Sequence, residues 1–211
     1  MSTTRVQLLD KSTTVGTGAA EDTKIVFDGN AQDFHIGMDD TDDYLVLGKG
    51  STPGTTPHIR MDQYGVVTKP LQPMFQANAS YTNIPLTTQQ TITLSERVDV
   101  NGDFNTSNYT FTAPVQGRYL ICANVELSNI DNANDYMRMR MNTSNIDYYQ
   151  GIWAPDKTFA SSGGYFSMHM AQIVDMDAND TCLIQLQINT GTAQTDIVGT
   201  YPNTFTGCLL A

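Results

Sequence analysis

The sequence predicts an all-β protein, and three features of the chain support that class. Several segments alternate apolar and polar residues with a period of two, and no stretch of ten or more residues shows a helical period of 3.6. Of the 22 acidic residues, 19 are aspartate, which favours turns over helix interiors. Threonine occurs 28 times and asparagine 15 times, so a β-branched strand former and a turn former are both abundant.

Length and charge exclude several classes of protein. The 211 residues can hold one large domain, or a medium domain with an ordered arm. The net charge of -11 repels nucleic-acid phosphates and anionic lipid surfaces, so we expect no nucleic-acid binding. The sequence shows neither an apolar run long enough for a membrane helix nor an N-terminal secretory signal. We therefore expect no membrane insertion and no export.

The cysteines indicate a reducing compartment. Cys122, Cys182 and Cys208 are odd in number, and each lies in an apolar run, where a free thiol behaves as a small hydrophobic group. We expect all three to be buried and inert. The chain contains no CxxC spacing, so the sequence predicts neither a zinc site nor a redox motif.

The proline-rich segment KPLQP at residues 69–73 divides the chain. Residues 1–23 are rich in Thr, Gly and Ala without a period and predict an extended arm. Residues 24–72 carry four short strand-like pieces, each too short to enclose a core, so they must pack on neighbouring copies or on a partner. Residues 73–211 carry longer strand-like segments at the spacing of a β-sandwich. Ordering the arm costs backbone entropy that only contacts with another chain can offset.

Two of the longer segments predict which residues face the core. In residues 136–141, three methionines alternate with Arg138 and Arg140, so the methionine face belongs to the core or a subunit contact and the arginine face is solvated or paired. In residues 181–188, the face opposite Cys182 is mixed, as expected of a surface half covered by another sheet or another subunit.

Residues 102–120 (GDFNTSNYTFTAPVQGRYL) carry an aromatic residue, a Thr-Ala-Pro turn and a Gly-x-Tyr strand in succession. This segment resembles the signature region of the C1q and tumour-necrosis-factor-like jelly-roll superfamily. The matching positions are Phe104, Phe111, Thr112, Ala113, Pro114, Gly117 and Tyr119. Pro114 suits a corner between strands, and Gly117 permits the close approach that turns Tyr119 inward.

Two later segments continue the resemblance. Residues 174–186 resemble the family's strand entered through a Gly-Asp turn, with Asn179, which tolerates left-handed backbone angles, in place of the glycine. Residues 204–211 resemble its closing strand, with Phe205, Gly207, Leu209 and Leu210 in place. The resemblance implies a C1q-like knob over residues 73–211 that forms a homotrimer through one face of the sandwich and rim aromatics.

The N-terminal segment indicates where such a knob is displayed. Residues 24–50 resemble β-repeat stretches found near the start of bacteriophage fibre proteins. The two resemblances together predict a phage virion structural protein, a homotrimeric appendage on the virion surface, assembled in the cytoplasm of a bacterial host. Residues 1–70 are expected to bind other capsid or tail proteins. Fewer than 50 residues can form a shaft, which favours a short head fibre or capsid decoration.

There are two alternatives to a head fibre or capsid decoration, of which the first stays open and the second is disfavoured. The first is a receptor-binding tail-fibre tip whose knob contacts a host glycan or receptor. The second is a secreted animal C1q-like module, which the absence of a Gly-X-Y repeat, a signal peptide and paired cysteines disfavours. Light scattering and particle labelling can separate these classes.

We expect no enzyme activity and predict no catalytic, cofactor or metal site. The histidines His35, His58 and His169 are scattered and form no Ser-His-Asp pattern. Two turns carry oxygen ligands that calcium prefers: Asp39, Asp40, Asp42 and Asp43; and Asp99, Asn101, Asp103 and Asn105. The second has Phe104 where a calcium loop needs glycine, and we expect solvated turns at both.

Exposed aromatics offer one further candidate. Trp153, with Tyr148 and Tyr149 nearby, can bind sugar rings or a partner. Trimer contact or loop packing is the competing interpretation, and the one we favour.

Overall fold

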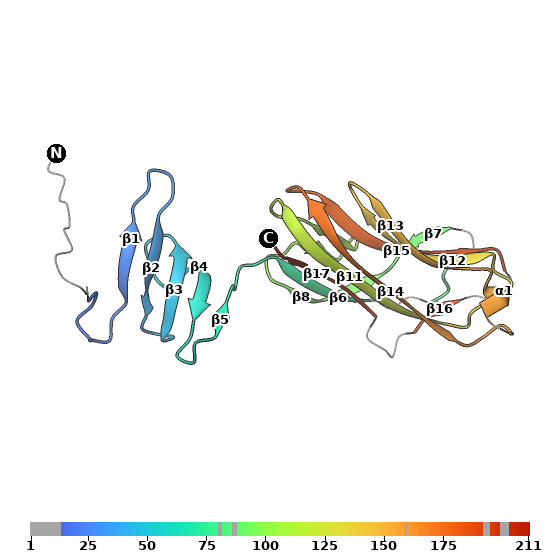
Figure 1. The fold of residues 1–211 in the computed structure, drawn as a ribbon, viewed down its shortest axis with the longest axis horizontal. Coiled ribbons are helices and arrows are strands. Elements are labelled where there is room, and N and C mark those ends of the chain that lie inside the picture. The colour runs from blue at the N-terminus through green and yellow to red at the C-terminus, as the bar shows by residue number, and fades with distance from the viewer. Residues whose placement is uncertain (1–13, 80–81, 86–87, 159, 192–194, 199–202) are drawn as a thin grey trace. The chain divides into compact units, whose positions relative to one another are not determined.

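The computed structural model describes residues 14–211 apart from 80–81, 86–87, 159, 192–194 and 199–202 (Figure 1). Within these residues the regular structure is β-strand except for one short helix, α1 (Pro155–Thr158), which confirms the all-β class. The chain forms two compact units, Met1–Leu71 and Gln72–Ala211, which meet inside the proline-rich segment. The part of the predicted arm at residues 1–13 lies outside the described residues, and residues 14–22 carry no strand or helix.

The N-terminal unit is one antiparallel sheet of five strands in sequence order. Each strand pairs with the next, so the unit is a meander in a single layer (Figure 1). The strands are β1 (Thr23–Phe27), β2 (Phe34–Asp39), β3 (Tyr44–Lys49), β4 (Pro57–Met61) and β5 (Val67–Thr68). Asp43, in the turn between β2 and β3, has a φ of 56°, which aspartate tolerates better than most residues.

The C-terminal unit consists of two antiparallel sheets. The β11 sheet has the order β14-β11-β17-β6-β8, with β16 beside β11; the β15 sheet has the order β13-β12-β15-β10-β9, with β7 beside β15. The strands of the β11 sheet are β6 (Met74–Ala79), β8 (Leu94–Asp99), β11 (Gly117–Ser128), β14 (Tyr165–Met176), β16 (Asp196–Ile197) and β17 (Thr204–Leu209). Those of the β15 sheet are β7 (Gln89–Thr91), β9 (Phe104–Asn105), β10 (Thr110–Thr112), β12 (Tyr136–Thr143), β13 (Asp147–Trp153) and β15 (Thr181–Asn189).

The strand order makes this unit a jelly roll. From β10 to β15 the chain crosses between the two sheets at every connection except the hairpin that joins β12 and β13. Strands far apart in sequence therefore become neighbours, as β17 does between β11 and β6. Such crossing between two packed sheets is the double Greek-key pattern of jelly rolls, and the predicted jelly-roll sandwich is confirmed.

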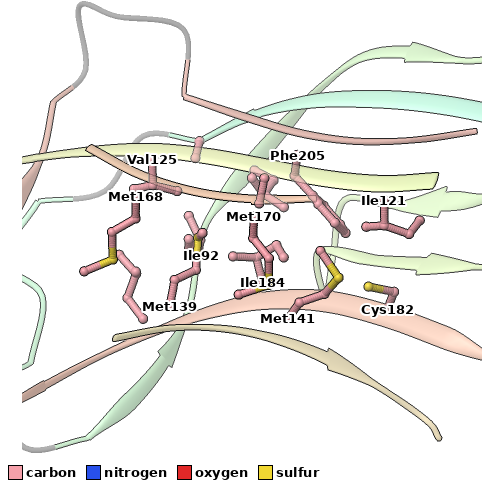
Figure 2. Packing of buried hydrophobic residues seen from close by; sticks show 14 of the residues in the cluster. Ile92, Ile121, Val125, Met139, Met141, Met168, Met170, Cys182, Ile184 and Phe205 are labelled. Atoms are coloured by element: carbon pink, nitrogen blue, oxygen red, sulfur yellow. The ribbon is translucent and has the colours of Figure 1, made fainter. Parts of the chain in front are cut away.

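The core lies between the two sheets. Met137, Met139 and Met141 of β12 are fully buried, which confirms the face predicted from their alternation with arginine. Figure 2 shows Met139 and Met141 facing Met168 and Met170 of β14 across the sandwich. Because methionine is unbranched and flexible, these side chains fill the irregular space between two twisted sheets.

Aromatic rings close one end of the core. The Phe75 ring centroid lies 4.6 Å from that of Phe111, 4.9 Å from that of Phe205 and 5.3 Å from that of Phe104. A side chain at Gly207 would place its Cβ 2.5 Å from Phe75, so only glycine fits there. The aromatic positions of the resemblance thus come together in one buried cluster.

The turn residues of the resemblance also adopt their predicted roles. Tyr119 is completely buried, and a Cβ at Gly117 would meet Leu209 at 2.6 Å, which confirms the close approach. Asn179 has a φ of 76°, so it takes the left-handed conformation that its position requires. The departure from the family's glycine is therefore absorbed by asparagine.

Two local expectations are wrong. Cys122 and Cys208 are only partly buried, because the period of two points both outward from the β11 sheet, whereas Cys182 points into the core. Asp39 is buried rather than solvated; its carboxylate accepts a hydrogen bond from the Thr41 amide in the turn that follows β2. In both cases, the direction in which the strand points a side chain determines its burial, and the polarity of the neighbouring residues does not.

Candidate subunit-contact surface

The outer face of the β11 sheet is divided into an apolar half and a polar half. On β11, residues with odd numbers point into the core and those with even numbers point outward. Register places Leu120 beside Ile173 of β14 and beside Cys208 of β17, which in turn opposes Met74 of β6. Four strands thus contribute one continuous apolar row.

A second row adjoins the first. Cys122 opposes Ala171 on one side and Thr206 on the other, and Gln76 connects this row to Val98 of β8. We call the outward-facing apolar residues of the two rows the knob patch. Its members are Met74, Val98, Leu120, Cys122, Ala171, Ile173 and Cys208.

The knob patch is partly hollowed and largely uncharged. A shallow depression of about 320 Å³ lies over β6, β8, β11 and β17, and most of its lining is apolar. Met74 and Ile173 are exposed at its edges. An apolar surface assembled from several strands suits contact with another protein surface better than contact with water.

The other half of the same face is polar. Asn124 lies between His169 of β14 and Thr204 of β17, and Glu126 follows one row further along. His169 is exposed there, an ordinary strand residue as predicted. The change from apolar to polar rows gives the sheet face a defined boundary, which is the pattern of an interface core beside its rim.

The two outward thiols add to the apolar character. Burial raises the pKa of the Cys122 thiol, with a smaller contribution from the nearby Cys208. The thiol therefore stays protonated at neutral pH, which keeps it weakly nucleophilic. Both cysteines are free, and they act in the knob patch as small apolar groups.

The outer face of the β15 sheet is held together by two arginines. Arg138 lies over the rings of Tyr136 and Tyr149, at 5.3 and 4.6 Å from their centroids, and donates a hydrogen bond to Gln187. Arg140 donates to Gln185 and to the Asp147 carboxylate, and it holds the pKa of Asp147 below its usual value. The arginine face is therefore paired within the chain. The sequence had left open whether this face is solvated or paired.

These contacts also explain the mixed face of β15. Gln185 and Gln187 are half-buried because the arginine side chains of the adjacent strand β12 lie against them. The sequence predicted that another sheet or another subunit half covers this face. The arginine side chains account for the burial of the two glutamines without such a cover. The long apolar stems of arginine can shield such a surface while their charged ends stay paired.

The three aromatic residues of the predicted set lie on β13, which points them to opposite faces of the sheet. Trp153 is 69% exposed and its ring lies 4.9 Å from that of Tyr136, while Tyr149 points to the same outer face. Tyr148 packs instead against the core. The segment forms strand β13, at whose end Trp153 is exposed in the single chain.

The two aspartate-rich turns differ. In the second, Asp99 accepts hydrogen bonds from the backbone amides of Gly102, Asp103 and Phe104, so its carboxylate shapes the turn. In the first, Asp39 is buried while Asp40, Asp42 and Asp43 are exposed. Among the described residues, no cluster of three or more His, Cys, Asp or Glu side chains has metal-binding geometry. His35 is buried in the N-terminal sheet, and His58 is exposed on β4.

Comparisons with known proteins give structural likenesses alone. No family model and no curated sequence matches the chain. The globular domain of zebrafish complement 1qA protein matches with a TM-score of 0.47 and 16% identity, covering 66% of this chain and 98% of that one. Murine APRIL matches with a TM-score of 0.47 and 9% identity, covering 66% and 99%. The strand order and register above define the jelly roll independently of these likenesses.

Helical membrane spans are also absent from the described part of the chain, because its one helix is four residues long. The knob patch could not be predicted from the sequence because its members lie on five strands that are far apart along the chain. Alternation within residues 119–125 is the one local signal, and it indicates only the outward direction of Leu120 and Cys122.

Proposed function

We propose that the protein is a homotrimer whose knobs pack together through the knob patch. The observation that supports this proposal is the apolar row of Ile173, Leu120, Cys208 and Met74 on the outer face of the β11 sheet. A monomer that exposes a contiguous apolar face tends to associate until the face is covered. Closed rotational symmetry lets identical faces cover one another without leaving a free one.

We also propose a structural role without enzyme activity. The polar side chains of the β15 sheet are tied to one another, as Arg140 is to Gln185 and Asp147, and this arrangement stabilises a rigid outer surface. The proposed setting is the surface of a phage virion, as a short head fibre or capsid decoration. The N-terminal unit attaches the knob to other virion proteins through residues 1–70.

A receptor-binding tail-fibre tip is the second candidate. Trp153 and Tyr149 support it, because both are exposed on the sheet that does not carry the knob patch. A knob that trimerises through the β11 sheet could present these rings to a host glycan or receptor. Flat aromatic rings with polar neighbours suit such contacts.

Light scattering tests the trimer. The purified protein should give a mass of about three times 23.2 kDa. Ile173→Asp places a charge in the knob patch and should yield monomers, whereas Ile146→Asp places the same charge in the turn between β12 and β13 and should leave the trimer intact. The pair is matched, since the two side chains are 60% and 54% exposed. A monomeric parent protein, or equal masses for the two variants, would contradict the proposed interface.

Particle labelling tests the location. Antibodies against the purified knob should bind intact virions, on the head if the protein is a head fibre or decoration. Labelling of tail tips would favour the receptor-binding alternative. Particles without label would remove the virion role altogether.

A further inference from the structure

The N-terminal sheet leaves one of its two faces apolar and uncovered. Along β2 and β3 the side chains alternate between buried and exposed, and the exposed ones are large apolar residues except for Lys49 at the end of β3. We call this surface the apolar face. Its members are Ile25, Phe27, Phe34, Ile36, Met38, Leu45, Leu47, Ile59, Met61 and Val67.

Register makes the apolar face continuous from edge to edge. Ile25, Ile36, Leu47 and Ile59 form one cross-strand row. A second row runs through Met38, Leu45, Met61 and Val67, and Phe27 and Phe34 pair at one end. Directly opposed apolar side chains on neighbouring strands support one another. The sheet therefore presents a single apolar surface rather than scattered exposed residues.

The opposite face is closed by the chain itself. His35 and Val46 are completely buried there, and His35 Nδ1 is hydrogen-bonded to the Gly50 carbonyl oxygen at 2.9 Å. The loop between β3 and β4 brings Pro53 into a buried position, and a Cβ at Gly54 would collide with the Asp39 carboxylate. The unit thus uses its own loop to cover the face that carries His35 and Asp39, and leaves the apolar face largely exposed, with Val15 bordering it beside Ile25 and Ile36.

A single-layer sheet with a bare apolar face needs a second layer, since it cannot otherwise remove that surface from water. Charges lie at the border of this face. Lys49 lies opposite Phe34, and the turn residues Asp43 and Asp62 border a depression with Met38, Leu45 and Met61. A net charge of -11 opposes contact between copies everywhere except through an uncharged surface of this kind.

The connection to the knob favours copies of the same chain as the partner. Five residues separate β5 from β6, and they span at most about 20 Å when extended. In the proposed knob trimer, this tether holds three apolar faces near one axis at an effective concentration on the order of millimolar. The other large apolar surface on the same tether, the knob patch, is already covered in that trimer.

We propose that the three N-terminal sheets of a trimer turn their apolar faces toward one another and form a shared core. The inference rests on the proposed trimer. In this arrangement Ile36 and Leu47, on the adjacent strands β2 and β3 that carry half of the face, lie in the interior. The acidic turns and the loop-covered face remain in water. The result is a compact shaft that joins the virion attachment to the knob.

Two substitutions on opposite faces of the sheet test the proposal in the full-length protein. Ile36→Glu adds a carboxylate to the apolar face, and Val26→Glu adds one to the other face of the edge strand. The two side chains are similarly exposed in the single chain, at 43% and 37%, so an uncovered sheet should tolerate both about equally.

The shared core predicts unequal results. For Ile36→Glu, tryptic cleavage at Lys24, Lys49 and Arg60 should accelerate at least about ten-fold and fluorescence of an apolar dye should rise several-fold. Light scattering should still show the trimer mass set by the knob. Val26→Glu should match the parent protein in all three measurements.

Three outcomes are decisive against the shared core. Equal behaviour of the two variants within an intact trimer would show that the apolar face is not packed. Strong dye binding by the parent trimer that Ile36→Glu reduces would show that the face is bare and awaits another protein. A monomeric parent would instead refute the proposed trimer itself, so the two failures are distinguishable.

Discussion

Tyr119 donates a hydrogen bond from its phenol to the backbone carbonyl oxygen of Val115, over 2.8 Å. The ring is completely buried and packs edge-on against Phe111, with 5.5 Å between centroids. The bond ties the start of β11 to the corner that follows Pro114. One side chain therefore fixes the entry into the longest pairing of the knob, that of β11 with β14.

Removing this side chain should destabilise the knob strongly. Tyr119→Ala loses a buried aromatic ring and should cost about 3 to 5 kcal/mol. Tyr119→Phe keeps the ring and loses the hydrogen bond, so it should cost about 1 kcal/mol. Arg118→Ala, the adjacent exposed position, should change the free energy of unfolding by less than about 0.5 kcal/mol. Urea unfolding measures all three, and similar losses at positions 118 and 119 would contradict the inward orientation of Tyr119.

Asp99 should stabilise its turn without calcium. Asp99→Ala leaves three backbone amides without their acceptor and should cost about 1 to 3 kcal/mol, whereas Asp42→Ala in an exposed turn should cost little. Millimolar calcium should leave the melting temperature of the parent protein unchanged. A rise in melting temperature with calcium that Asp99→Ala abolishes would show that the turn binds the cation.

The period of two explains why the core was predictable and the knob patch was not. Met137, Met139 and Met141 alternate with charged residues, so the buried face of β12 is visible in the sequence itself. The knob patch combines Met74 of β6 with Ile173 of β14, and their proximity depends on the crossing order of the strands. Long-range pairing of this kind leaves no local pattern in the chain.

The cysteines show the same limit in another form. The apolar runs around Cys122 and Cys208 suggested burial, but direction along a strand, and not the neighbouring residues, decides which face a thiol occupies. Strand β13 was missed because Ile152 is its one buried residue, so the segment shows no alternation of apolar and polar residues. A strand at the edge of a sheet needs fewer buried apolar residues than a central strand, so its sequence pattern is weaker.

Stability should fall at high pH because of Cys182. Burial raises the pKa of its thiol from 9.0 to about 12. The neutral thiol of the folded state is favoured, so this contribution is complete below pH 9 and is lost as pH rises toward 12. One proton contributes a slope of about 1.4 kcal/mol per pH unit in that window. Unfolding of Cys182→Ala from pH 9 to 11 should lack this part of the slope, whereas Cys208→Ala should keep it; equal slopes for all three proteins would contradict the assignment.

Deleting residues 1–22 should separate folding from attachment. The deletion keeps β1 whole and removes a segment whose described residues, 14–22, are all exposed, so no buried residue among them is lost from the N-terminal sheet or the knob. The shortened protein should therefore keep its trimer mass and its melting temperature. Ordering residues of an arm costs roughly 1 to 2 kcal/mol each, which contacts with the particle can offset.

Incorporation into virions is the measurement that decides the role of this arm. Particles assembled without the protein should bind the full-length chain and fail to bind the shortened one. Normal incorporation of the shortened chain would place the attachment in residues 23–70, where the N-terminal sheet would then meet the particle directly. Loss of the trimer instead would assign the arm to the base of the trimer, because the knob patch alone would not then hold three copies together.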